Sequence, residues 1–216
     1  MNIEQARFNM IEQQIRPWEI TDLSVIELLA AVKREDFVPA AYRNLAFADT
    51  AIPLGHGAAM LPPVIEARAL QALALTPNVR VLEVGTGSGY MAALLATKAE
   101  NVWTVEIVPE LAALARETLA RAGTPNVIVE QGDGLAGLPA QAPFDAIMVS
   151  GSVPAIPREL LAQLKTGGRL FAVVGEGPVM QAQLVTRNGE NQWSTQALFE
   201  REAAPLQVVA RPAFVF

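Results

Sequence analysis

Short apolar runs alternate with longer helical patterns in the second half of the chain. We expect strands where an apolar run ends at glycine or a polar turn, and helices where apolar residues recur at helical spacing. Such alternation predicts an α/β sheet with parallel strands joined by right-handed crossovers. The predicted strands are 79–84, 101–106, 126–131, 143–149 and 168–174, and the predicted helices between them are 88–98, 109–122 and 157–164.

The first third of the chain shows a different pattern. Two stretches, 3–15 and 23–32, carry apolar residues at helical spacing, and a further helix is predicted at 64–75. The stretch 52–63 is rich in glycine and proline, which predicts a loop. Because this loop lies immediately before the α/β part of the chain, it is a candidate wall of a substrate site.

The last part of the chain is strand-like. Segments 181–187 and 207–216, linked by the polar turn 188–191, predict a hairpin at the edge of the sheet. Ala203-Ala204-Pro205 is expected to be a flexible joint. We therefore expect a single domain, 1–216, that consists of N-terminal helices and the substrate loop (1–76), an α/β core (77–178) and C-terminal antiparallel strands (179–216).

The strand 79–84 runs directly into alternate glycines, Gly85, Gly87 and Gly89, as in the first turn of a nucleotide-binding βαβ unit. The spacing differs from the dinucleotide motif, and Glu83 precedes it. A carboxylate there would repel a phosphate but attract an ammonium or sulfonium cation. S-adenosyl-L-methionine carries both cations and no phosphate. The candidate cofactor-binding residues of this turn are Glu83, Gly85, Thr86, Gly87, Ser88 and Gly89.

Two further strand ends carry acids. Glu106 lies 19 residues after Gly87, close to the spacing of about 20 residues at which an acid binds ribose hydroxyls in doubly wound folds. Ile107 follows it and is included in the predicted cofactor site. Asp133-Gly134 ends the third strand, where the carboxylate could accept a hydrogen bond from an adenine amino group. The alternative for Asp133 is a turn former that binds its own backbone.

Composition excludes several kinds of chemistry. The 216 residues contain no cysteine and a single histidine, His56, so disulfides, thiolate catalysis, a zinc site and a Ser-His-Asp triad are not expected, and no metal is predicted. The net charge of -6 without a basic cluster makes nucleic acid an unexpected partner. No apolar run approaches the roughly 18 residues of a membrane span. The polar N-terminus is unlike a secretory signal, so a cytoplasmic location is expected.

Four motifs of the chain are informative together: Arg34-Glu-Asp-Phe-Val-Pro39, Leu82-Glu-Val-Gly-Thr-Gly-Ser-Gly-Tyr90, Gly132-Asp-Gly134 and Ala142-Pro-Phe-Asp-Ala-Ile147. In combination they resemble one enzyme family, the protein-L-isoaspartate (D-aspartate) O-methyltransferases. The resemblance implies a Rossmann-like S-adenosylmethionine-dependent methyltransferase fold: a seven-stranded, mostly parallel sheet with an antiparallel last strand and an N-terminal helical extension. It also implies methylation of the free α-carboxylate of isoaspartyl residues in proteins or peptides, with 77–178 as the cofactor-binding core.

The chain departs from the family in the substrate loop. Where the family has Thr-Ile-Ser, this chain has Ala59-Met60-Leu61, and the family's Arg-Phe-Val-Pro-Leu strand falls on 202–206, which reads Glu-Ala-Ala-Pro-Leu. The loop candidates are therefore Ala59, Met60, Leu61 and His56, the last either a base for a new nucleophile or a histidine without a catalytic role.

Three interpretations follow from this departure. The protein is an isoaspartyl methyltransferase, a methyltransferase redirected to another, unknown small-molecule acceptor, or a cofactor-binding protein without isoaspartyl activity. The sequence leaves the oligomeric state open.

Overall fold

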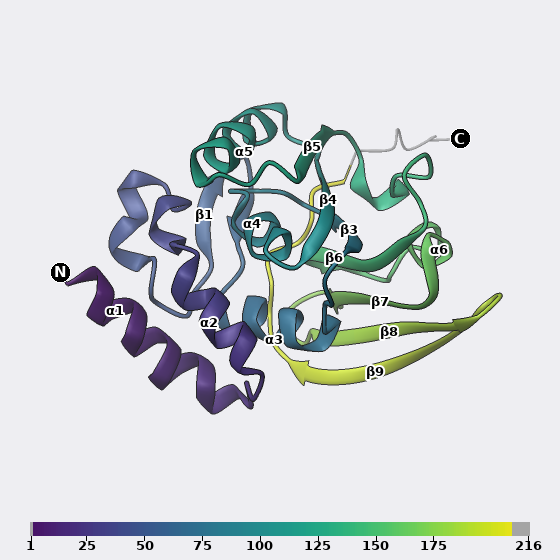
Figure 1. Cartoon of the computed structure of the whole chain (residues 1–216), viewed down its shortest axis with the longest axis horizontal. Helices are drawn as coiled ribbons and strands as arrows, with labels where there is room; N and C mark the ends of the chain where they lie inside the picture. Colours follow the sequence, from purple (N-terminus) through teal and green to yellow (C-terminus); the bar gives the residue numbers. More distant parts are fainter. Residues whose placement is uncertain (1, 209–216) are drawn as a thin grey trace.

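The computed structural model describes residues 2–208. Its centre is a seven-stranded sheet in the order β5-β4-β3-β6-β7-β8-β9 (Figure 1). The strands are β3 (Val79–Val84), β4 (Ala99–Glu106), β5 (Val127–Gln131), β6 (Phe144–Val153), β7 (Leu164–Val174), β8 (Gln181–Gly189) and β9 (Gln192–Glu200).

The first five strands are parallel to one another, whereas β8 pairs antiparallel with both β7 and β9. The seven-stranded, mostly parallel sheet expected from the sequence is thus confirmed, with antiparallel pairing at the end of the chain. The strands that follow β3 extend to one side of it as β4 and β5, and then to the other as β6 and β7. Such a reversal leaves a crevice at the carboxyl ends of β3 and β6, where open α/β sheets bind ligands.

The edge hairpin differs from the sequence-based prediction in its second strand. The polar turn is tight, with Asn191 in a left-handed conformation (φ 56°), so the chain returns at once and β9 at Gln192–Glu200 pairs with β8. The segment 207–216 was therefore wrongly predicted as this partner, because a tight turn pairs the residues nearest to it. Residues 209–216 of that segment lie outside the described part of the chain.

The helices agree with the predicted ranges to within a few residues, except at the N-terminus. There the single predicted helix, 3–15, is divided into α1 (Ile3–Asn9) and a π-helix (Met10–Ile15), and a 3-10 turn (Arg16–Trp18) follows. The remaining α-helices are α2 (Leu23–Ala31), α3 (Pro63–Leu73), α4 (Tyr90–Ala96), α5 (Pro109–Ala122) and α6 (Arg158–Ala162). Short 3-10 helices occupy Arg34–Asp36, Ala40–Leu45 and Gly134–Ala136.

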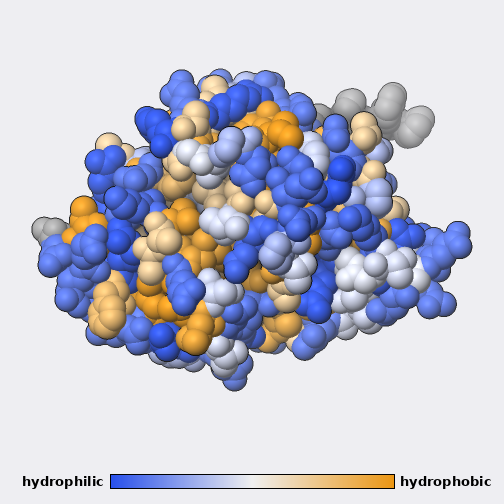
Figure 2. Space-filling view, viewed as in Figure 1, coloured by the Kyte–Doolittle hydropathy of each residue, from blue (hydrophilic) through white to orange (hydrophobic). Residues whose placement is uncertain are grey.

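Side-chain alternation along β3 divides the core between the two faces of the sheet. Val81 packs in the larger cluster, with residues of the N-terminal helices, α3 and α4, whereas Leu82 and Val84 pack in the cluster that contains Leu160 of α6. Because alternate residues share a face, Glu83 points to the same side as Val81, toward α4. Figure 2 shows hydrophobic surface over the N-terminal helices, while the region of the β8–β9 hairpin is hydrophilic.

Two segments expected to be irregular are ordered by backbone hydrogen bonds. The loop 52–63 contains an antiparallel hairpin, β1 (Ile52–Gly55) with β2 (Ala58–Met60). The supposed joint Ala203-Ala204-Pro205 is attached to β6: Ser152 N donates to Ala204 O at 2.8 Å, and Leu206 N donates to Ser152 O at 2.9 Å. Composition alone misassigned both segments because their order depends on pairing partners, one of which lies about fifty residues away in sequence.

Within residues 2–208, none of the helices has the length and apolar character needed to cross a membrane.

Candidate functional site

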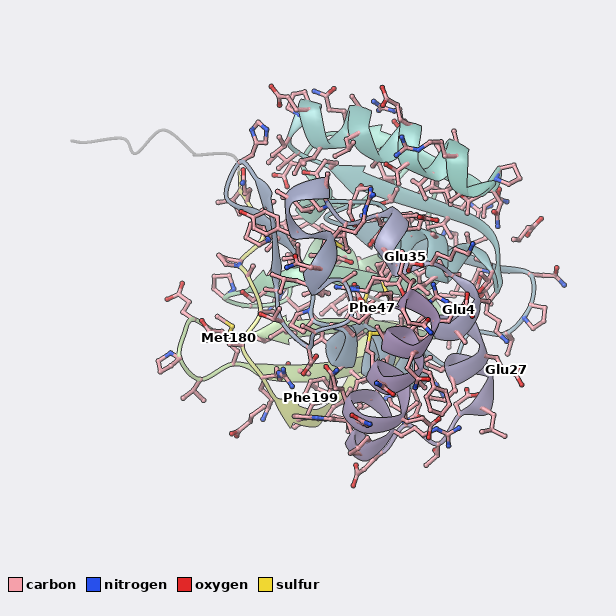
Figure 3. All side chains as sticks on the ribbon, turned by 90° about the vertical axis from the view of Figure 1, so that its left-hand side faces the viewer. Glu4, Glu27, Glu35, Phe47, Met180 and Phe199 are labelled. Carbon is pink, nitrogen blue, oxygen red and sulfur yellow. The ribbon has the colours of Figure 1, made fainter. Side chains whose placement is uncertain are left out.

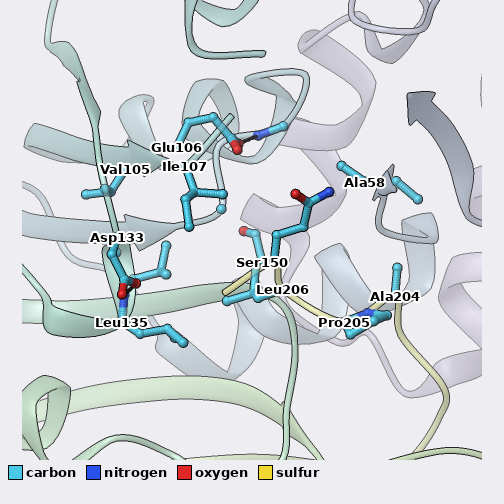
Figure 4. A pocket seen from close by; sticks show the side chains of 16 residues that line it. Ala58, Val105, Glu106, Ile107, Asp133, Leu135, Ser150, Ala204, Pro205 and Leu206 are labelled. Atoms are coloured by element: carbon cyan, nitrogen blue, oxygen red, sulfur yellow. Dashed lines mark hydrogen bonds between the residues drawn. The ribbon is translucent and has the colours of Figure 1, made fainter. Parts of the chain in front are cut away.

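A pocket that we call the outer cavity lies at the carboxyl ends of β3, β4 and β5, beside Ser150 of β6 (Figure 4). It unites residues from three successive strand ends, as the parallel arrangement predicted. The predicted cofactor residues on its wall are Gly85, Gly87, Glu106, Ile107, Asp133 and Gly134; the other lining residues are Ala58, Ala59, Val84, Val105, Leu135, Ser150, Ala204, Pro205, Leu206 and Gln207.

The glycine turn requires glycine both for its conformation and for its close packing. Gly85, Gly87 and Gly89 all have positive φ, at 91°, 52° and 85°, a region that other residues rarely adopt. A Cβ atom on Gly85 would lie 2.6 Å from Cδ2 of Leu206. The turn therefore lies directly beneath the C-terminal segment.

Glu106 is held in place by the turn that it supports. Its Oε2 accepts from Gly87 N at 2.7 Å, and its Oε1 accepts from Val108 N at 3.0 Å. Each carboxylate oxygen retains a second acceptor position, so two neighbouring hydroxyl groups could bind here. Glu106 is buried on the cavity wall, which is compatible with the predicted ribose contact.

Asp133 forms the local contact that its alternative interpretation predicted. Its Oδ1 accepts from Leu135 N at 3.0 Å and caps the 3-10 helix that follows. The same side chain is exposed and lies on the wall of the outer cavity, as Figure 4 shows. Capping leaves acceptor capacity on the carboxylate, so the adenine contact stays a prediction alongside the turn-forming role.

Glu83 lies on the wall of a second, smaller pocket, the inner chamber, which shares Ala59, Gly85, Gly87 and Ser150 with the outer cavity. Glu83 is fully buried, and its two oxygens accept from Thr104 Oγ1 and Ser150 Oγ, both at 2.7 Å. Burial raises the pKa of Glu83 to about 8, while those two hydrogen bonds oppose the rise.

The hydroxyl groups of the glycine turn are engaged within the protein. Thr86 Oγ1 lies 2.7 Å from Thr104 Oγ1, which in turn donates to Glu83. Ser88 Oγ accepts from Tyr90 N at 3.3 Å, at the start of α4. Both residues line the inner chamber, but the contacts of their hydroxyls stabilise the turn and Glu83.

The structure brings together three of the four loop candidates. Ala59 lines both cavities, whereas Met60 and Leu61 are buried and line the inner chamber only. His56 is exposed in the turn between β1 and β2, with φ 52°, and it is not among the residues that line either cavity. The geometry therefore does not place His56 with the other three.

An open groove adjoins the outer cavity and shares Leu135, Ala204, Pro205 and Leu206 with it. Pairing of Arg201 with Asp49 at 2.5 Å forms part of its wall. Two exposed acids, Glu176 and Glu202, also line the groove.

The sequence analysis missed three residues of the site. Ser150 follows a predicted strand at the same sheet edge as Gly85, and that position could have revealed it. Leu206 was hidden by the interpretation of the preceding residues as a flexible joint. Glu66 of α3 lines the inner chamber, and no sequence signal distinguished it from a solvent-exposed helix acid.

The chemistry of these groups matches the cofactor that was predicted. Acceptor oxygens at Glu106 and Asp133 suit the hydroxyl and amino donors of adenosine, and a buried carboxyl group at Glu83 suits a cation, whereas a phosphate would meet like charge. Among residues 2–208, no group of three or more metal-ligating side chains lies close enough to hold a metal ion. The fold and the site define a Rossmann-like methyltransferase.

Comparisons with known proteins identify the family. The family description "Protein-L-isoaspartate(D-aspartate) O-methyltransferase (PCMT)" matches residues 5–206. A protein-L-isoaspartate O-methyltransferase of Myxococcus xanthus is 49% identical over 156 residues, which are 72% of this chain and 74% of that protein. Protein-L-isoaspartate O-methyltransferase 2 of Marinobacter nauticus is 40% identical over 206 residues, 95% of this chain and 94% of that one. The chain belongs to the protein-L-isoaspartate(D-aspartate) O-methyltransferase family.

A solved structure supports the fold. The Plasmodium falciparum enzyme described as a protein-L-isoaspartate O-methyltransferase, in complex with S-adenosyl-L-homocysteine, superposes with a TM-score of 0.81 at 22% identity and covers 96% of this chain and 99% of its own. The resemblance stated from the motifs is thus confirmed at the level of family and fold.

Proposed function

We propose that this protein is an S-adenosylmethionine-dependent O-methyltransferase that esterifies the free α-carboxylate of isoaspartyl residues in damaged proteins or peptides. In the family, the ester then permits succinimide formation and a return to normal aspartate. The observation that carries the proposal is the junction of the outer cavity with the groove, which share Leu135, Ala204, Pro205 and Leu206. A peptide in the groove would lie beside a cofactor in the cavity.

The residues that would hold the cofactor divide between the two cavities. Glu106 would accept from the ribose hydroxyls, Asp133 from the adenine amino group, and Ile107 would contact the base. Glu83, with Gly85 and the rest of the glycine turn, would face the amino-acid end in the inner chamber. When bound, S-adenosylmethionine supplies an activated methyl group on a sulfonium, which a carboxylate oxygen can accept by in-line displacement.

The protein itself has little proton chemistry to perform for such an acceptor. A peptide carboxylate is already ionised near pH 7, so no general base is required and the exposed position of His56 is no obstacle. Catalysis then depends on orientation and on exclusion of water. Pro205 and Leu206, held against β6 by backbone hydrogen bonds, would provide the apolar cover between donor and acceptor.

The test uses purified protein, methyl-labelled S-adenosylmethionine and a peptide pair that differs only in one aspartyl linkage, isoaspartyl or normal. We expect base-labile methyl ester on the isoaspartyl peptide alone. Equal labelling of both peptides, or none above the enzyme-free control, would contradict the proposed acceptor.

A second candidate function is methyl transfer to another, unidentified small-molecule acceptor. The observation that favours it is the wall of the inner chamber, where Ala59 and Leu61 stand at the positions of the family's two hydroxyl residues, beside apolar Met60 and a buried acid, Glu66. Labelled donor that is consumed with a metabolite mixture but not with isoaspartyl peptide would favour this candidate. Binding of S-adenosylhomocysteine without transfer to any acceptor would favour a protein that only binds the cofactor.

A further inference from the structure

Two adjacent residues of the 3-10 helix Arg34–Asp36 form buried ion pairs in opposite directions. Glu35 pairs with Arg7 of α1, and Arg34 pairs with Glu66 of α3. All four side chains are buried. The Arg7 guanidinium carbon also lies 5.7 Å from the centre of the Phe47 ring, so Arg7 contacts both Glu35 and Phe47, which are labelled in Figure 3. The Arg7–Glu35 pair therefore lies among the N-terminal helices, whereas the Arg34–Glu66 pair lies at the wall of the inner chamber.

Arg34 contacts three residues of the inner-chamber wall. Its Nη1 donates to Glu66 Oε2, and its Nη2 donates to the carbonyl oxygen of Leu61 at 2.7 Å. Its guanidinium carbon lies 4.9 Å from the centre of the Tyr90 ring. Leu61, Glu66 and Tyr90 all line the chamber, and they come from the β2–α3 connection, from α3 and from the first residue of α4.

Stability alone does not account for this arrangement. Desolvation of a buried ion pair offsets most of its attraction, and apolar pairs of similar volume are often as stable. Among the described residues, Arg34 Nε and the Tyr90 hydroxyl are buried without a hydrogen-bond partner, which adds to the cost. The planar guanidinium does, however, hold the Glu66 carboxylate and the Leu61 carbonyl in a fixed relative orientation, because its N–H groups point in set directions.

We propose that Arg34 is a positioning residue, which acts through the Leu61 carbonyl, Glu66 and Tyr90 to set the β2–α3 connection against the glycine turn and α4. The width of the inner chamber then depends on a residue that does not itself line it. The identity of the ligand in that chamber rests on the proposed function. The contacts of Arg34 do not.

The test replaces the whole pair by apolar residues, Arg34→Met with Glu66→Leu, so that no buried charge is left alone. The matched control is Arg7→Met with Glu35→Leu, a second buried pair that does not touch the chamber wall. We expect both double variants to fold, and only the first to weaken S-adenosylhomocysteine binding in calorimetry, by about tenfold, which is the effect of losing about one hydrogen bond to the ligand. Unchanged affinity in the first, or equal loss in both, would overturn the proposal.

Arg34→Lys decides the matter if the double variant does not fold. A lysine can pair with Glu66 but lacks the fork that reaches the Leu61 carbonyl at the same time. We expect normal thermal stability with an S-adenosylhomocysteine affinity lowered several-fold, and an unchanged affinity would count against positioning. Because this measurement needs no acceptor, absence of isoaspartyl methylation would contradict the proposed function while leaving the assignment of Arg34 intact.

Discussion

Glu83 and Glu66 place two buried carboxyl groups on the wall of the inner chamber. Burial raises the pKa of Glu83 to about 8 and that of Glu66 to about 7, in the second case against the opposing effect of Arg34. Glu83 is therefore largely protonated at pH 7 in the free protein. A cation bound beside it would favour the charged form and lower its pKa.

We predict that S-adenosylmethionine binding at pH 7 releases close to one proton from Glu83. Calorimetry in two buffers of different ionisation enthalpy measures this number directly, and Glu83→Gln should reduce the release to near zero. The raised pKa of Glu83 also makes the stability of the free protein depend on pH. The stabilising contribution of Glu83 is full below its ordinary pKa of 4.5 and is lost as the pH rises through 8. We therefore predict that the free energy of unfolding, measured with urea, falls less steeply between pH 5 and 8 in Glu83→Gln than in the wild type. Parallel curves for the two proteins would contradict the assignment.

Glu106 supports the glycine turn, and we predict that it also accepts from the ribose hydroxyls of the cofactor. Glu106→Ala removes the acceptor of Gly87 N and Val108 N together with the predicted ribose contact, so we expect the binding free energy of S-adenosylhomocysteine to weaken by about 1.5–3 kcal/mol, with some loss of stability. Asp133→Ala should cost less affinity, because one amino contact is involved. Equal affinities of wild type and Glu106→Ala would show that the ribose lies elsewhere.

At the scale of elements, the β1–β2 hairpin and the start of α3 carry the departure from the family. Ala59 lies where outer cavity and inner chamber meet, and Leu61 presents a buried apolar side chain to the chamber. A carboxylate against such a surface loses hydration without gaining a donor, at a cost of about 1–3 kcal/mol. If the acceptor carboxylate binds in the chamber, we expect the hairpin to limit how well it is held.

We predict that Leu61→Ser combined with Ala59→Thr increases the rate of isoaspartyl peptide methylation. The gain should be modest, because Glu202 and Ala203 still replace the basic and aromatic residues that the family has near the C-terminus. Steady-state rates on the isoaspartyl peptide measure the effect, with Ala59→Ser alone as a comparison. A wild-type rate equal to that of a serine-containing relative would refute the idea.

At the scale of the whole molecule, Asp49 joins parts of the chain that are 152 residues apart. Its Oδ1 accepts from Val64 N at the start of α3, and its Oδ2 accepts from Arg201 at 2.5 Å, where the C-terminal segment enters the groove. The α3 helix and the groove are thus attached to the same side chain.

We predict that Asp49→Ala lowers the free energy of unfolding by about 1–2 kcal/mol, the usual range for loss of a helix cap, and raises KM for the peptide acceptor. Asp49→Asn retains an oxygen for the cap but loses the charge, so it should keep most of the stability and still raise KM. Urea unfolding and peptide kinetics on both variants separate these roles. An unchanged KM in both variants would show that the C-terminal segment takes no part in binding the acceptor.

The parallel strands were predicted more accurately from the sequence than the N-terminal helix was, and the reason is physical. The parallel strands and their crossover helices were assigned correctly because alternation and helical spacing reflect burial on both faces of one sheet. The N-terminal helix was predicted as one piece, 3–15, whereas the structure divides it after Asn9. Apolar spacing cannot distinguish an α-helical turn from a π-helical one, because both place similar residues toward the core.

The parallel core, the glycine turn and the three strand ends that carry Glu83, Glu106 and Asp133 could be predicted from the amino-acid sequence, since each of these depends on a short stretch of chain. Three contacts could be known only from the folded protein: Ser150 donates to Glu83, Glu66 pairs with Arg34 at the inner chamber, and Leu206 covers Gly85. Those contacts join residues far apart in sequence. Their formation depends on how helices and strands pack, which no local pattern of apolar and polar residues records.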